Sequence, residues 1–110
     1  MDFGEKQALY KKFVEACGFD VKGKAGYTSK NGHMFSFIGK DGTVAIRLSP
    51  EDKDEFESEH NTGDVIQYNA VMRGYVPISN ELLLDTNRCS SYLKASEAYI
   101  STLKPKPTKK

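Results

Sequence analysis

The chain has 110 residues, of which 38% are apolar and 28% charged, and this composition fits one globular domain. Its net charge is +1, from 16 basic and 15 acidic residues, which argues against a general polyanion binder. The N-terminus lacks an apolar signal core, and no run approaches the roughly 20 apolar residues of a membrane span. We therefore expect a cytoplasmic protein without membrane association, in which Cys17 and Cys89 are small, reduced, buried side chains.

The first expected element is a helix over residues 3–17. Leu9, Phe13 and Cys17 recur at the spacing of one helical face, and lysines fill the other side. Gly18 is a suitable stop because glycine accepts the left-handed conformation just beyond a helix.

Three strands are predicted next, over residues 21–30, 33–39 and 43–48. Asn31-Gly32 is the pair that a type I′ turn requires, and Asp41-Gly42 is a second hairpin signal. The alternation of the third strand places Val44, Ile46 and Leu48 on one face and Thr43, Ala45 and Arg47 on the other. In the second strand, Phe35 and Phe37 oppose Met34, Ser36 and Ile38, and both sets are too apolar to show which meets the core.

The second half predicts a helix, two strands and a closing helix. Ser49-Pro50 is a strong helix start, and the helix should end near His60, with Phe56 as its one large apolar anchor. Strands follow at residues 65–68 and 72–78, and Pro77 marks a strand end or a sheet edge. Ser79 can cap a short helical turn. A long apolar stripe from residue 89 to 103 predicts the last helix, which starts at Asp85 or Thr86.

These elements indicate an α+β fold of order α-β-β-β-α-β-β-α, with an antiparallel sheet of about five strands flanked by the N- and C-terminal helices. Residues 1–104 form a single domain in this interpretation. Residues 105–110 contain only proline, lysine and threonine, and are expected to be a disordered basic tail.

Two passages resemble the N-terminal domain family of TfoX (Sxy) competence regulators. Met72-Arg73-Gly74-Tyr75-Val76 is similar to a short Met-Lys/Arg-Gly-aromatic-Val strand of that family, and residues 92–106 resemble its closing helix and Leu-Pro-Pro-Lys-like tail. The Asn31-Gly32 hairpin and residues 47–51 match in position, so the similarity covers about residues 5 to 106. The family carries Met-Phe-Gly-Gly where this chain has residues 22–26. The resemblance implies a single-domain member with a regulatory role.

No catalytic or metal-binding pattern stands out. His33 and His60 have no Cys or carboxylate at metal-ligand spacing, and the acidic run 51–59 lacks the glycine of a calcium loop. No nucleophile elbow, phosphate loop or dinucleotide fingerprint is present. We therefore expect neither enzymatic activity nor a metal or other cofactor.

Basic residues give the candidate binding surface, which consists of Lys22, Lys24, Lys30, Arg47 and Arg73. Aromatic side chains lie among them on the predicted strands, a combination that some sheets use to bind single-stranded nucleic acid. The leading hypothesis is a non-enzymatic regulatory domain with a protein partner, and a homodimer is a further alternative. The second hypothesis is a weak nucleic-acid-binding domain that uses the first hairpin and the sheet face.

Overall fold

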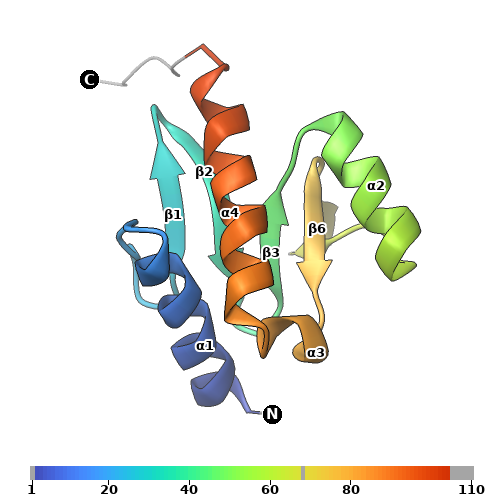
Figure 1. Cartoon of the computed structure of the whole chain (residues 1–110). Coiled ribbons are helices and arrows are strands. Elements are labelled where there is room, and N and C mark those ends of the chain that lie inside the picture. The colour runs from blue at the N-terminus through green and yellow to red at the C-terminus, as the bar shows by residue number, and fades with distance from the viewer. Residues whose placement is uncertain (1, 68, 105–110) are drawn as a thin grey trace.

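The computed structural model describes residues 2–67 and 69–104. The expected basic tail, residues 105–110, lies outside this range. The elements in chain order are α1 (Phe3–Ala16), β1 (Tyr27–Lys30), β2 (His33–Ile38), β3 (Val44–Arg47), α2 (Pro50–His60), β4 (Ile66–Gln67), β5 (Ala70–Val71), β6 (Tyr75–Ile78), α3 (Asn80–Leu83) and α4 (Thr86–Ser101) (Figure 1). The predicted α+β class with an antiparallel sheet is confirmed.

The helices begin at the capping residues that the sequence indicated. The Ser49 side chain accepts a hydrogen bond from the Asp52 N–H, and Ser79 and Asp85 cap α3 and α4 in the same way. Asn61 ends α2 in the left-handed conformation, with a φ of 52°. Local chain chemistry therefore fixes the ends of these helices.

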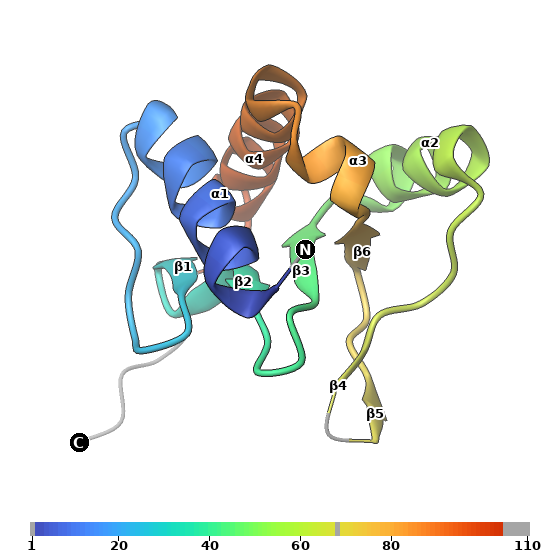
Figure 2. The ribbon, with the colours of Figure 1, turned by 90° about the horizontal axis from the view of Figure 1, so that it is seen from below.

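Four antiparallel strands form the main sheet, in the order β1-β2-β3-β6. The helices lie in one layer against one face of this sheet, and α4 crosses it in contact with β1, β2 and β3 (Figures 1 and 2). In the part of the chain that the structure describes, no helix covers the opposite face. That face is the feature from which the functional proposal starts.

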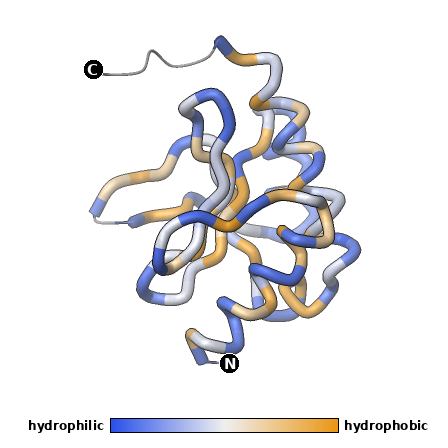
Figure 3. The backbone as a smooth tube through the Cα atoms, turned by 90° about the vertical axis from the view of Figure 1, so that its left-hand side faces the viewer, coloured by the Kyte–Doolittle hydropathy of each residue, from blue (hydrophilic) through white to orange (hydrophobic). Residues whose placement is uncertain are grey.

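Strands β4 and β5 pair only with each other and form a separate hairpin. The expectation of one sheet of about five strands is therefore wrong in this detail. The hairpin projects on the side of the sheet away from the helices (Figures 2 and 3), and Ile66 and Val71 on it are 61% and 51% exposed. Val65 and Met72 hold the base of this short hairpin against the sheet by packing with Phe37, Ala45 and Tyr75. The Met72 N–H also donates a hydrogen bond to the Val65 carbonyl, which joins the two arms of the hairpin.

A β-bulge in β2 decides which residues face the helices. Thr28 pairs with Ser36 but Ser29 pairs with Met34, so Phe35 is an extra residue in β2. Phe35 and Ser36 consequently both face the helix layer. Met34 and Phe37, on either side of them, face the helix-free side. The prediction that Phe35 and Phe37 share a face is therefore wrong, because the bulge interrupts the alternation of side chains.

The main core lies between the sheet and the helices. It includes Val44, Ile46 and Leu48 of the third strand region, as the alternation predicted, together with Phe56 of α2. A chain of three hydroxyl groups runs through it: Tyr10 Oη lies 2.7 Å from Ser36 Oγ, which lies 2.6 Å from Thr28 Oγ1. All three side chains are fully or almost fully buried, and burial raises the pKa of Tyr10 well above its ordinary value.

Candidate functional site

A second, smaller apolar cluster occupies the helix-free face of the sheet. Its members are Phe37, Ala45, Val65 and Tyr75, with Met34 and Met72 packed against them at partial exposure. The rings of Phe37 and Tyr75 lie 5.3 Å apart, and the Tyr75 hydroxyl donates a 2.7 Å hydrogen bond to the Met34 carbonyl. Burial raises the pKa of Tyr75 to about 12. The cluster is thus ordered although no helix covers it.

A cleft of about 290 Å³ opens beside this cluster. Its lining is mostly apolar side chains and glycine backbone, from four segments: residues 23–27, Met34 with Phe37 and Ile38, residues 39 and 40, and Gln67 with Met72. Loop 23–26 forms one wall and the β4–β5 hairpin forms the other. An apolar cavity with few polar groups is the usual character of a binding site.

Hydrogen bonds fix both walls of the cleft. The Gln7 amide donates to the Lys24 carbonyl at 3.0 Å and to the Ala25 carbonyl at 2.8 Å, so α1 holds the loop. On the other wall, the Gln67 amide donates to Asp41 Oδ2 at 3.3 Å and to its own neighbour's carbonyl. Gly39 leaves room for the Gln67 side chain, since an added Cβ would overlap Gln67 Oε1. The cleft is therefore preformed.

Two of the three lysines of the predicted binding surface, Lys22 and Lys30, line one cleft together with Glu97, and Lys24 lines another. Lys22 is exposed and donates to Ser29 Oγ at 3.0 Å. Lys24 lines the apolar cleft. Lys30 instead forms an ion pair with Glu97 of α4 and donates to Ser101 Oγ at 2.9 Å, on the helix side. The structure does not bring these three charges together into one basic patch.

The two arginines line a different, wide cleft of about 650 Å³ beside the N-terminal turn of α2. The guanidinium carbon of Arg47 lies 5.8 Å from the centre of the Tyr99 ring, a cation–π distance. Arg73 is exposed, and among the described residues neither arginine forms an ion pair. Asp54 and Asp64 line the same cleft, so its charge is mixed.

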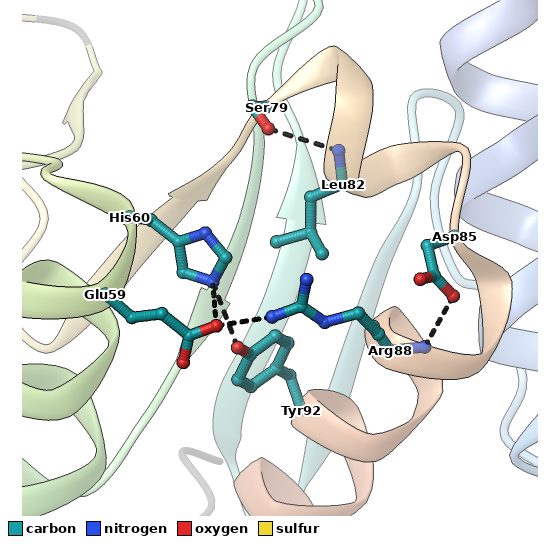
Figure 4. A network of polar contacts seen from close by, with 7 residues as sticks. All are labelled: Glu59, His60, Ser79, Leu82, Asp85, Arg88 and Tyr92. Carbon is teal, nitrogen blue, oxygen red and sulfur yellow. Dashed lines mark hydrogen bonds and ion pairs between the residues drawn. The ribbon is translucent and has the colours of Figure 1, made fainter.

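The most extensive polar network of side chains lies on the helix side, between α2 and α4 (Figure 4). His60 Nε2 lies 3.1 Å from the Tyr92 hydroxyl and 3.5 Å from Glu59 Oε2, and Arg88 pairs with the same carboxylate. The His60 ring also stacks on Phe56, with centroids 4.3 Å apart. These groups bond to one another, and they hold an otherwise polar helix against α4.

The other candidate residues are also engaged in structural contacts. His33 Nε2 lies 2.7 Å from the Lys104 carbonyl, while its Nδ1 is buried without a partner in the described part of the chain. Cys89 is buried and Cys17 half-buried, and both thiols are free. Burial raises the pKa of the Cys89 thiol to about 12. Across residues 2–67 and 69–104, no three His, Cys, Asp or Glu side chains gather as a metal site would require.

The sequence did not reveal the cleft because its walls come from distant segments. Lys24 was the one cleft residue named among the candidate site residues; Met34, Lys40, Gln67 and Met72 were not. Glycines at 23, 26 and 39 are the signal that was available, since glycine in or near strands marks close approach of backbone. These glycines do not show on which face of the sheet the cleft lies, because that depends on the bulge in β2.

Comparison with known proteins gives no family to set beside this geometry. No family model, no curated protein and no solved structure matches the chain. Among the helices described here, none is both long enough and apolar enough to cross a membrane.

Proposed function

We propose that the chain is a non-enzymatic regulatory domain that binds a protein partner through the helix-free face of its sheet. The observation that carries this proposal is the second apolar cluster with its open, preformed cleft. Phe37, Ala45, Val65 and Tyr75 are themselves buried, so the apolar surface open to a partner is the lining of the cleft, which includes half-buried Met34 and Met72. A mostly apolar, concave surface is typical of binding sites.

The resemblance to the TfoX N-terminal domain family belongs to this proposal. Residues 72–76 and the closing helix carry it, and the order of helices and strands is compatible with it. A cytoplasmic location is also proposed, supported by the free thiols of Cys17 and Cys89.

Nucleic-acid binding through the first hairpin receives less support from the geometry. Lys30 is neutralised by Glu97, and the arginines lie in another cleft with two aspartates. A homodimer that buries the same sheet face is the other alternative, and it would appear as a larger particle in sedimentation analysis of the isolated chain.

The test is a pull-down from the protein's own cell lysate, treated with nuclease and eluted across a salt gradient. Three baits are compared: the natural chain, a double variant Ile66→Asp and Val71→Asp, and the control Leu84→Asp. Leu84 is 64% exposed but lies on the helix side after α3, so it matches the exposure of the hairpin residues. The proposal requires a protein that survives nuclease and is lost only with the hairpin variant. Loss with both variants, or bound nucleic acid alone, contradicts it.

A further inference from the structure

The size of the cleft restricts what it can hold. At about 290 Å³ it lies at the lower end of the roughly 300–1,000 Å³ range of small-molecule sites. It suits one large apolar side chain better than a cofactor. Met34 and Met72 contribute flexible, polarisable side chains that adapt to an aromatic ring. Because the walls are fixed by Gln7 and Gln67, little ordering is needed on binding.

Basic side chains outnumber acidic ones at the cleft. Lys24 and Lys40 are exposed and line it, and neither forms an ion pair with any residue that the structure describes. The nearest carboxylate on the wall, that of Asp41, accepts hydrogen bonds from the Thr43 N–H and from Gln67. These bonds lower its pKa, so it stays ionised and is held in the wall. Two lysines and this one carboxylate leave a net positive charge at the cleft, and neither ammonium group is paired.

The surface next to the cleft can extend the contact. Tyr27 is 37% exposed and lies against Gly23 at one wall. At the other wall, half-buried Met72 is the apolar lining residue, next to Gln67. A short extended segment that lies across the cleft would therefore meet the Tyr27 ring on one side and Met72 on the other.

We infer that the cleft binds an acidic segment of a protein partner. One large apolar side chain of that segment, an aromatic by preference, fills the cleft, and aspartate or glutamate next to it pairs with Lys24 and Lys40. This inference rests on the proposed function and adds the chemistry of the partner. Charge complementarity sets the choice of occupant, because an uncharged or basic segment would leave two ammonium groups unpaired or repelled.

The probe is a phage-displayed random dodecapeptide library, selected on the full chain at low salt. Selected peptides are then made with a fluorescent label and titrated by anisotropy. The test variant is Lys24→Glu with Lys40→Glu. The control is Lys11→Glu with Lys12→Glu, which changes the net charge equally on exposed positions of α1 in the helix layer.

The expected selection is peptides with an aromatic residue flanked by aspartate or glutamate. Their affinity should fall about tenfold or more in the test variant, stay unchanged in the control, and weaken with salt. Equal weakening in both variants, or failure to enrich acidic peptides, would overturn the inference.

Backbone amide NMR of the natural chain separates this failure from failure of the proposed function. If non-acidic peptides bind and shift the signals of Phe37, Met72 and their neighbours, the sheet face still binds protein and only the acidic chemistry is wrong. If the shifted signals lie on α1 and α4, both proposals fail.

Discussion

Replacing Ser36 by alanine tests why apolar side chains such as Phe37 lie on the helix-free face of the sheet. Ser36 is the middle member of the buried hydroxyl chain, bonded to Tyr10 of α1 and to Thr28 of β1. It also stands directly after the bulged residue Phe35. In a strand with unbroken alternation, Ser36 and Phe35 would face opposite sides of the sheet. The hydrogen bonds of the Ser36 hydroxyl hold this residue on the helix side, and Phe37 therefore faces the cleft.

The expected loss of stability follows from the groups left without partners. Ser36→Ala leaves the hydroxyls of Tyr10 and Thr28 both buried and unpaired, which costs about 2–4 kcal/mol. Tyr10→Phe breaks only one of the two bonds and leaves Ser36 paired with Thr28, so it costs about 1 kcal/mol.

Urea unfolding, followed by far-UV circular dichroism, measures both costs. With a slope near 1.5 kcal/mol per M, the midpoint should fall by about 2 M for Ser36→Ala and by less than about 1 M for Tyr10→Phe. A smaller loss for Ser36→Ala than for Tyr10→Phe would refute the reasoning, because it would mean that the serine is not the shared partner. Peptide binding at the cleft should weaken in Ser36→Ala but persist in Tyr10→Phe.

Three further outcomes are expected from the same geometry. In the native protein a thiol reagent such as Ellman's should label Cys17 first, and Cys89 only on unfolding, since burial raises the Cys89 pKa to about 12; equal rates would contradict this. The raised pKa of Tyr75 contributes stability that is fully present below pH 10, the ordinary tyrosine pKa, and is lost as the pH rises toward about 12. Tyr75→Phe should therefore flatten the decline of the unfolding free energy by about 1 kcal/mol per pH unit, measured by urea unfolding at alkaline pH. An unchanged slope would count against this. Gly39→Ala should displace Gln67 and weaken binding of the selected peptides without unfolding the chain; undiminished affinity would show that this wall takes no part.

Local chemistry made the helices predictable. Ser49, Ser79 and Asp85 each cap where the sequence indicated, and Asn31-Gly32 has φ values of 54° and 82°, as the predicted type I′ turn requires. These features depend on a few neighbouring residues, and no tertiary contact is needed to decide them.

The open face could not be predicted because it depends on contacts between distant segments. The bulge at Phe35 follows from bonds that Ser36 makes to Tyr10 and Thr28, which no periodicity records. The strand predicted over residues 65–68 was expected in the main sheet, but β4 pairs with β5 away from that sheet. The predicted binding surface joined five basic residues because they are of one type. In the fold, Lys30 pairs with Glu97, whereas Lys24 lines the cleft.

Site-specific photo-crosslinking tests the central claim most directly. A photoreactive phenylalanine analogue is placed at Met72, which lines the cleft, at Val71, on the exposed hairpin, or at Ser91, an exposed position of α4 in the helix layer. Irradiation in nuclease-treated lysate should give a discrete protein adduct from positions 71 and 72 and none from position 91. An adduct from position 91 alone would contradict the claim that the helix-free face of the sheet is the binding surface.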